Sequence, residues 1–318
     1  MTAEIQSPPG TSSRVPCTLC GATDGRELFR TPERRFGMGG AFALVRCARC
    51  DLVRTEPQPD DLGSFYPNGY YSFVPPTPPG GLANARLRRR YGLPVDGPSA
   101  RRVLAGVGIS RLSPGLPPGP PGRLLDVGCG SGEAIAGLSE IGWQCTGVEV
   151  SEEAVAAART AGLDVRLGDL RGADFDDSSF DVVRFWHALE HLRSPKAELA
   201  ETRRILRPGG LVLIGVPNFA SLLSRLVREQ WFYLDVPRHL WHFERGTLAR
   251  LLTEAGFRVE DVRLASTSSP ILGTVDFLRG RDGVLASKRL VWLGTLPLAA
   301  LLDVLGLGDA LEARARAV

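Results

Sequence analysis

The stretch that most constrains the fold is LLDVGCGSGEA at residues 124–134, an apolar run leading into a glycine-rich turn and then a helical pattern. Glycine lets a backbone turn sharply and approach a ligand closely at the carboxyl end of a strand. From residue 123 onward, strand-like apolar runs alternate with helical patterns, as in βαβ units with a parallel sheet. The sequence therefore predicts an α/β, doubly wound, Rossmann-like domain over residues 123–318, with a ligand at the glycine turn.

The same alternation predicts individual elements of this domain. Strands are expected at 123–127, 144–150, 165–169, 181–187, 211–216 and 257–264. Helices are expected at 133–142, 152–162, 194–207 and near 246–256, with Gly162 suited to the position after the second helix and Pro208-Gly209-Gly210 stopping the third.

Two smaller zones precede this domain. Residues 14–73 carry two C-x-x-C pairs, Cys17/Cys20 and Cys47/Cys50, and end in the aromatic stretch FYPNGYYSF. Residues 74–122 are rich in proline and glycine and contain the basic run RLRRR, which indicates a linker with at most a short helix near 82–91.

The four N-terminal cysteines predict a structural zinc site. Each pair puts two sulfurs on one tight turn, and the spacer between the pairs can form a small hairpin, so Cys17, Cys20, Cys47 and Cys50 can surround one tetrahedral ion in a zinc ribbon. Four thiolates leave no open position for water, so this metal is not expected to catalyse a reaction. Cys129 and Cys145 are expected to be packing residues.

Composition narrows the class of protein and its compartment. A net charge of +3 over 318 residues is too mild to argue for a nucleic-acid partner. The first residues lack a basic start followed by an apolar run, so no signal peptide is expected. With six cysteines and no export signal, the chain is expected in a reducing cytoplasm.

The residues around the glycine turn argue against a dinucleotide. The dinucleotide fingerprint requires glycine or alanine where Glu133 stands, and the carboxylate of Asp126 would sit poorly beside a pyrophosphate. Asp126 suits an ammonium group, Glu149 at the end of the second strand suits ribose hydroxyls, and Asp169 or Leu170 suits an adenine edge. An amine, a ribose and an adenine without phosphates describe S-adenosylmethionine.

The chain thus resembles the class I S-adenosylmethionine-dependent methyltransferases. The matching stretches are LLDVGCGSG, VEVS at 148–151, GDL at 168–170, FDVVRFWHALEHL at 180–192 and LRPGGLVLIGVPN at 206–218. The resemblance implies a seven-stranded sheet closed by ALEARARAV as its last, antiparallel strand. It also implies cofactor contacts from Asp126, Gly128, Cys129, Gly130, Glu149, Val150, Asp169, Leu170, Trp186 and His187.

All four histidines fall into two short segments, WHALEH at 186–191 and VPRHLWHF at 236–243. Both segments leave the carboxyl edge of the expected sheet, so they can face one cleft. Methyl transfer to a hydroxyl or a carbon acid needs a general base, and histidine titrates in the useful range. The candidate catalytic residues are His239, His242 and His187, with His239 first. His187 can alternatively pack against adenosine, and His242 can be a structural hydrogen-bond donor.

The ribbon followed by a methyltransferase domain is also similar, distantly, to sugar C-methyltransferases. In that family a histidine in an HLxxF-like segment is the catalytic base, and His239 occupies the matching position. Pro237 and Arg238 replace the tyrosine and glutamate that precede this histidine there. A metal site of His187, Glu190, His191 and a later histidine stays open as an alternative, since it partly matches a Glu-x-x-Glu-His site of some small-RNA and quinone methyltransferases.

Aromatic residues near the histidines are candidates for the substrate wall or for the core. Trp186, Trp231, Phe232, Tyr233 and Trp241 can offer π faces to a sulfonium or a sugar ring, or simply pack in the core. Tyr66, Tyr70 and Tyr71 can line the substrate wall.

The apolar segment 288–308 is too short for a confident membrane span. A buried helical pair, an interfacial helix and a re-entrant hairpin are the three alternatives, so both a membrane-surface element and simple core stay open.

The expected function is methyl transfer from S-adenosylmethionine to oxygen or carbon of a small-molecule or glycan-type acceptor, such as a sugar or lipid-linked sugar. One alternative is O-methylation of a quinone or lipid. The other is a zinc-ribbon binding module without turnover, contacting RNA or a protein.

Overall fold

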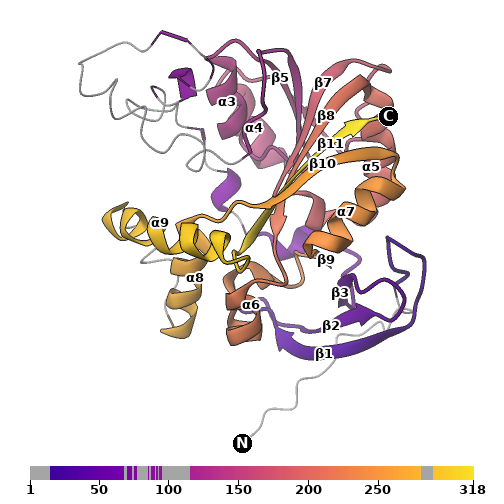
Figure 1. The fold of residues 1–318 in the computed structure, drawn as a ribbon, viewed down its shortest axis with the longest axis vertical. Helices are drawn as coiled ribbons and strands as arrows, with labels where there is room; N and C mark the ends of the chain where they lie inside the picture. The colour runs from indigo at the N-terminus through magenta and orange to yellow at the C-terminus, as the bar shows by residue number, and fades with distance from the viewer. Residues whose placement is uncertain are drawn as a thin grey trace, which may run out of the picture.

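The computed structural model describes residues 15–67, 70–73, 75–76, 85, 87–89, 91, 93–94, 115–280 and 289–318. Two sheets organise these residues (Figure 1). A large seven-stranded sheet forms the centre of the molecule, and a four-stranded sheet at its lower right carries the N-terminal strands.

The large sheet confirms the predicted α/β fold class. Its order is β10-β11-β8-β7-β4-β5-β6, and only β11 runs antiparallel to its neighbours. Its strands are β4 (Arg123–Val127), β5 (Gln144–Glu149), β6 (Val165–Leu167), β7 (Phe180–Trp186), β8 (Leu206–Pro217), β10 (Phe257–Leu264) and β11 (Ala310–Ala317). The chain adds β5 and β6 on one side of β4 and β7 and β8 on the other. The direction of strand addition therefore reverses at β4, and the carboxyl ends of β4 and β7 lie beside each other, where ligands bind in such sheets.

Four helices connect these strands, within a few residues of their predicted bounds. They are α3 (Glu133–Ser139), α4 (Glu152–Thr160), α5 (Pro195–Ile205) and α7 (Arg245–Glu254). Gly162 follows the end of α4 with a φ of 77°, as predicted. The end of α5 differs from the prediction, because β8 begins at Leu206 and includes Pro208-Gly209-Gly210. The pairing of β7 with β8 shifts register there, so the strand tolerates Gly209 in a left-handed conformation.

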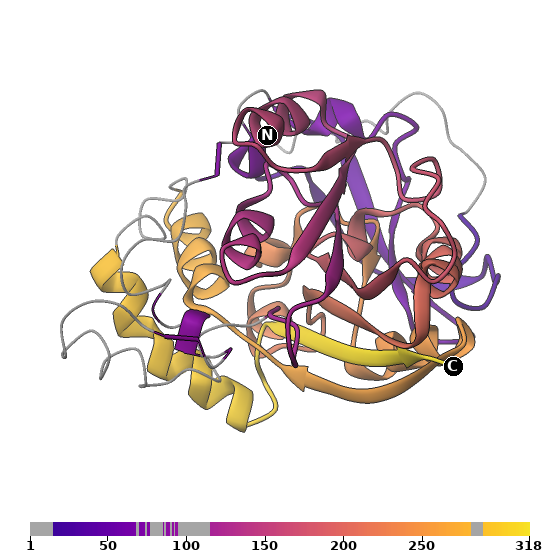
Figure 2. The ribbon, with the colours of Figure 1, turned by 90° about the horizontal axis from the view of Figure 1, so that it is seen from above.

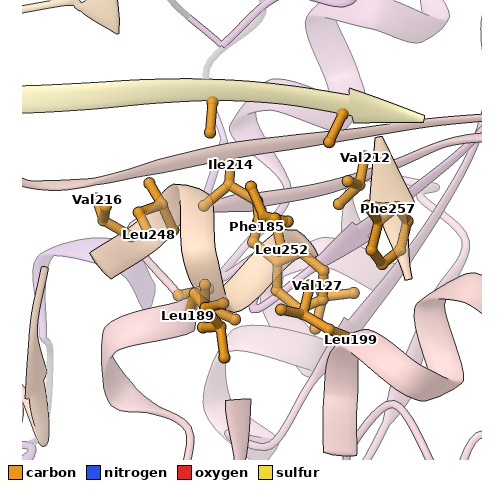
Figure 3. Close-up of a cluster of buried hydrophobic side chains, with 14 of the residues drawn as sticks. Val127, Phe185, Leu189, Leu199, Val212, Ile214, Val216, Leu248, Leu252 and Phe257 are labelled. Atoms are coloured by element: carbon orange, nitrogen blue, oxygen red, sulfur yellow. The ribbon is translucent and has the colours of Figure 1, made fainter. Parts of the chain in front are cut away.

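The main core lies between this sheet and helices α5 and α7. Figure 3 shows Leu248 and Leu252 of α7 close to Val216 and Ile214 of β8. Successive residues of a strand point to opposite faces of the sheet. Because these parallel strands are buried on both faces, their sequences are nearly continuously apolar.

The ribbon consists of β1 (Gly25–Pro32), β2 (Ala41–Cys47) and β3 (Val53–Glu56), followed by the short turns η1 (Gly63–Phe65) and η2 (Tyr71–Phe73). Its sheet has a fourth strand, β9 (Trp241–His242), which comes from the segment after β8. Because β9 pairs with β3, the ribbon and the histidine-bearing segment share one hydrogen-bonded sheet.

The segment after β8 also holds α6 (Leu222–Val227) and the turns η4 (Arg228–Gln230) and η5 (Phe232–Leu234). Two later helices, α8 (Ser268–Leu278) and α9 (Arg289–Val304), project together at the lower left of Figure 1 and again at the left of Figure 2. None of the helices within the described residues combines the length and hydropathy needed to span a bilayer.

The predicted apolar tail forms a single helix with one buried and one exposed side. Ala299 and Leu302 of α9 pack with Ile271 of α8, whereas Leu301 and Leu305 are 53% and 59% exposed. Residue 288 and most of the predicted linker helix near 82–91 lie outside the described residues; positions 85 and 87–89 are helical.

Candidate functional site

The glycine loop lies at the carboxyl ends of β4 and β5. Gly128, Gly130 and Gly132 have φ values of 68°, 55° and 86°, a conformation that other residues rarely adopt. A side chain at Gly130 would lie 2.6 Å from the carbonyl oxygen of Ser72, and that oxygen accepts a hydrogen bond from the Ser131 amide at 2.8 Å. The segment after the ribbon therefore lies directly against the glycine loop, which requires glycine there for space as well as for φ.

The two acidic residues beside this loop are held in place by different partners. Asp126 is buried and accepts from Nη1 of Arg184 on β7, at 2.7 and 2.8 Å. Glu149 accepts from the Gly130 amide at 2.9 Å and from the Val150 amide at 2.8 Å. Asp126 thus neutralises a buried cation, a partner that the sequence did not indicate, while Glu149 orders the loop itself. Their direct contacts with a cofactor stay predictions.

The carboxyl edge of β5 fits an adenosine. The side chain of Val150 is 72% exposed there, next to the buried Glu149, and an exposed aliphatic residue is a suitable surface for a planar base. Asp169 is exposed at the end of β6, while Leu170 is buried beneath it. The glycine loop, the two acids and this apolar edge therefore suit S-adenosylmethionine, and the contact of Glu149 with its ribose stays a prediction.

Two other residues predicted at the cofactor have additional packing roles. The ring of Trp186 packs closely over Gly115 and Gly215, where an added Cβ would lie 2.6 and 2.4 Å from ring atoms. Cys129 is partly buried, and burial raises the pKa of its thiol. The ring of Trp186 thus packs against the segment before β4 and against β8.

Three of the four histidines meet around Glu190, so the two segments form one site. Glu190, in the turn η3 (Leu189–His191), is fully buried. Nδ1 of His187 lies 3.4 Å from its Oε1, and Nε2 of His239 lies 4.0 Å from the same oxygen. The rings of His191 and His239 meet edge to face, with centroids 4.6 Å apart. We call Glu190, His187, His191 and His239 the histidine cluster.

The cluster also borders the glycine loop. A side chain at Gly128 would meet the Cβ of Ala188 at 2.8 Å, and Ala188 directly follows His187. The site of the predicted cofactor and the histidine cluster are therefore neighbours.

His239 presents an unprotonated ring nitrogen to this cluster. Its Nδ1 lies 2.9 Å from the carbonyl oxygen of Tyr233. Since a carbonyl only accepts, Nδ1 carries the proton and Nε2 of the neutral ring holds a lone pair. Burial, assisted by His191, lowers the pKa of His239 to about 4 despite Asp235 and Glu190 nearby. His239 is therefore neutral at neutral pH, as a general base must be before it acts.

Within the histidine cluster, Glu190 is the residue whose buried carboxylate lacks hydrogen bonds from described residues. Burial opposes its ionisation, but His187 and the other imidazoles together lower the pKa of Glu190 below its usual value. Within the described residues, neither of its carboxylate oxygens makes a well-formed hydrogen bond. Such a group calls for a cation or a proton, and Glu190, His191 and His239 offer ligand atoms within 4.8 Å of one another.

His242 lies outside the cluster. It is buried, its Nε2 lies 2.9 Å from the hydroxyl of Thr55, and burial lowers its pKa well below the usual value. This arrangement favours the structural role over the catalytic one that the sequence also allowed.

Aromatic residues after the ribbon connect the cluster to the glycine loop. The hydroxyl of Tyr66 lies 2.8 Å from Nδ1 of His191, and its ring contacts Tyr70 and Phe73 in the segment that carries Ser72. Tyr66 and Tyr70 thus lie beside the histidine cluster, and their role as a substrate wall stays a prediction. The side chain of Tyr71 is outside the described residues. Of the other aromatic candidates, Trp231 and Trp241 are core residues.

The four N-terminal cysteines meet as predicted, and their geometry suits zinc. The Sγ atoms of Cys17 and Cys50 are 3.4 Å apart, and those of Cys20 and Cys47 are 3.5 Å apart. Zn–S bonds of about 2.3 Å place tetrahedral sulfurs about 3.8 Å apart. All four sulfurs lie within 4.8 Å of one another. Together they would hold zinc as a structural ion.

A network of buried charges lies next to His239, and no pattern in the sequence indicated it. Arg238 has no exposed side-chain surface and donates to Glu33 of the ribbon at 2.6 Å and to Asp235 at 2.6 and 3.0 Å. Arg35 of the ribbon pairs with the other oxygen of Asp235 at 3.1 Å. The sequence marked Arg238 only as a departure from the sugar C-methyltransferases.

Comparison with known proteins agrees with this geometry. A probable S-adenosylmethionine-dependent methyltransferase of Mycolicibacterium smegmatis is 32% identical over 143 residues, or 43% of this chain and 52% of that protein. A ubiquinone biosynthesis O-methyltransferase of Xanthomonas oryzae pv. oryzae is 31% identical over 153 residues, or 44% of this chain and 64% of that protein. The chain thus spans about half to two thirds of the length of these curated relatives.

Among solved structures, a methyltransferase from Thermotoga maritima, described as a possible histamine N-methyltransferase, aligns with a TM-score of 0.45 and 22% identity over 64% of this chain and 84% of that one. Residues 100–262, about half of the chain, match the family described as Methyltransferase domain. The chain belongs to this methyltransferase family, and its sheet has the class I Rossmann-like arrangement.

Proposed function

We propose that this protein transfers the methyl group of S-adenosylmethionine to oxygen or carbon of a small-molecule or glycan-type acceptor, with His239 as the general base. In this reaction the bond from sulfur to the methyl carbon breaks, and a bond from the acceptor atom to that carbon forms. The acceptor's proton passes to Nε2 of His239, and S-adenosylhomocysteine leaves. The cofactor activates the methyl group, so the protein must orient the acceptor and accept a proton.

One observation carries this proposal: a neutral, buried imidazole with its lone pair facing a carboxylate, beside the glycine loop. The Tyr233 carbonyl holds the ring by Nδ1, and Glu190 lies 4.0 Å from Nε2. A carboxylate near a histidine base stabilises the imidazolium that forms when the base takes a proton.

The acceptor class is supported by two features. The relatives that include ubiquinone biosynthesis O-methyltransferases favour a hydroxyl-bearing ring. The exposed side of α9, with Leu301 and Leu305, supports peripheral contact with a lipid surface, which suits a lipid-linked sugar or quinone.

The test measures S-adenosylhomocysteine formation with a panel of dTDP-sugars, a polyprenyl-linked sugar and catechol. We expect turnover with one class of acceptor in this panel. His239→Gln should lower kcat about 100- to 10,000-fold, while S-adenosylmethionine binding measured by calorimetry is retained. Full activity of His239→Gln would remove His239 as the base. Cofactor binding without turnover across the panel would favour the binding module.

A second candidate chemistry for the same site is a divalent cation at Glu190, His191 and His239, favoured by the unsatisfied carboxylate of Glu190. Two imidazoles and one carboxylate suit Mn²⁺, Co²⁺ or Zn²⁺. Zinc-loaded protein would be titrated with Mn²⁺ and followed by electron paramagnetic resonance. Stoichiometric binding that Glu190→Gln abolishes would support a metal-assisted transfer, and its absence would leave His239 as a base.

A further inference from the structure

Strand β3 of the ribbon reaches the candidate base directly. The Thr55 amide donates to the Leu240 carbonyl at 3.0 Å, and the Thr55 hydroxyl donates to the His239 carbonyl at 2.7 Å. Thr55 has no exposed surface, and His239 is only 5% exposed. A residue nearly two hundred positions earlier in the sequence thus binds the main chain of the residue that carries the base.

The same hydroxyl fixes the tautomer of His242. Its single proton goes to the His239 carbonyl, since that oxygen can only accept. The hydroxyl must therefore accept from Nε2 of His242, 2.9 Å away, so that Nε2 carries the proton. The ring centroids of His242 and His239 are 6.4 Å apart. Thr55 and His242 are therefore direct neighbours of the proposed base.

The amides of His239 and Leu240 bind residues outside the ribbon. Its amide donates to the Asp235 carbonyl at 3.0 Å, and the next amide, Leu240, donates to the Glu190 carbonyl at 2.8 Å. With Nδ1 held by Tyr233, the carbonyl of His239 is the group that depends on the ribbon.

The cysteine site lies directly before β3. Cys47 ends β2, Cys50 follows in the turn, and β3 begins three residues later at Val53. The Cys47 amide donates to the Leu52 carbonyl at 3.0 Å, so the turn that carries two of the sulfurs also starts β3.

We propose that Thr55 is a positioning residue for His239, and that the zinc ribbon thereby aims the base of the methyltransferase domain. This inference rests on the proposed function, in which His239 is the general base. It gives the ribbon a role at the acceptor side of the site, separate from cofactor binding at the glycine loop. Displacing a catalytic group by about 1 Å can cost about 100-fold in rate.

The test uses the full chain with zinc bound and compares Thr55→Val, which keeps the shape but loses the hydroxyl, with Thr55→Ser, which keeps the hydroxyl. Thr31→Val is the matched control, because Thr31 is a buried ribbon threonine. Within the part of the chain that the structure describes, its hydroxyl bonds to Pro32 and Arg34 of the ribbon. The four histidine rings are observed by long-range ¹H–¹⁵N correlation, which reports each tautomer. Methyl transfer is measured on the panel described above.

In the unaltered protein we expect His239 protonated at Nδ1 and His242 at Nε2. Thr55→Val should change the His242 and His239 ring signals and lower kcat about 10- to 100-fold, with S-adenosylmethionine affinity within twofold. Thr55→Ser and Thr31→Val should behave like the unaltered protein. Unchanged ring signals and kcat in Thr55→Val would overturn the proposal.

A second measurement covers the case in which Thr55→Val does not fold. Removing zinc from the unaltered chain with a chelator should broaden the His239 and His242 signals while cofactor binding persists, and unchanged signals would again overturn the proposal. The ring signals also separate this inference from the proposed function. If they respond but no panel compound is methylated, positioning stands and the proposed function fails.

Discussion

The two sides of the site are built in opposite ways. The cofactor side is a contiguous strand, glycine turn and helix, ordered by main-chain hydrogen bonds such as that from the Gly128 amide to the Val148 carbonyl. The histidine cluster takes its residues from two segments distant in sequence, one after β7 and one after β8. Thr55 of the ribbon binds the second segment, and buried charges surround it. The glycine turn of the methyltransferase family is thus a local motif, whereas the proposed acceptor side depends on contacts distant in sequence.

The largest expected effect comes from breaking the charge network behind His239. Arg238→Met would leave Glu33 and Asp235 as buried carboxylates without their main partner, and should lower the free energy of unfolding by about 3–5 kcal/mol. Urea denaturation measures it. Arg250→Met, on the exposed side of α7 with side-chain exposure of 49%, is the control and should cost less than about 1 kcal/mol. A loss for Arg238→Met as small as the control's would mean that the network does not stabilise the acceptor side.

The corresponding change on the cofactor side is Asp126→Asn, which keeps the shape but removes the charge that faces Arg184. We expect a loss of about 2 kcal/mol in unfolding free energy, since a buried guanidinium loses its ionic partner. Calorimetry with S-adenosylmethionine then distinguishes a cofactor contact of Asp126 from a purely structural role. Lost affinity at unchanged stability would show that Asp126 contacts the cofactor, and the reverse would show that it only supports the sheet.

A pH-dependent effect is expected at Asp309, which accepts from Nε1 of Trp231 at 3.0 Å. Burial raises the pKa of Asp309 to about 6 from an ordinary value of 3.8. The folded state therefore binds a proton more tightly than the unfolded state, and stability is lost as pH rises from about 4 to about 6. We expect this loss to be about 1–2 kcal/mol.

Asp309→Asn should remove this loss, because an amide keeps the acceptor for Trp231 without the charge. The melting temperature of the variant should exceed that of the unaltered protein at pH 8 and match it at pH 4. Equal melting temperatures at both pH values would contradict the assignment.

The smallest effect on stability is expected on the exposed side of α9. Leu301→Gln should change the unfolding free energy by less than about 0.5 kcal/mol. If α9 contacts lipid, the same change should reduce co-sedimentation with anionic lipid vesicles. Ala299→Gln, at a buried position of the same helix, should instead lower stability. Unaltered vesicle binding by Leu301→Gln would remove α9 as a lipid contact.

Much of the fold could be predicted because its signals are local. The strands and helices from residue 123 onward follow from the period of apolar residues, and the cysteine pairs follow from their spacing. The end of α5 could not be predicted, because Pro208-Gly209-Gly210 normally stops an element. Here β8 continues across these residues, and it pairs with β7 at Leu206 before them and from Leu211 after them. Tertiary pairing overrode the local preference there.

The candidate site divides in the same way. The sequence identified the histidines, and it expected both segments at one edge because parallel strands share that edge. It could not identify Thr55 or Glu33, whose residue types are ordinary and whose positions in the ribbon carry no catalytic pattern. Nor could it show that Asp126 faces Arg184, since both residues look like independent members of their strands.

The sheet, the glycine turn and the cysteine site followed from the sequence alone, because the signal for each lies within a few positions. These signals are the period of apolar residues, the glycine spacing and the two C-x-x-C pairs. Only the tertiary structure decided which histidine faces Glu190, which tautomer each ring adopts and what surrounds Arg238. The physical reason is that hydrogen bonds and buried ion pairs depend on angstrom-scale distances. Those distances are fixed where β3 pairs with β9, a contact between segments that no local pattern relates.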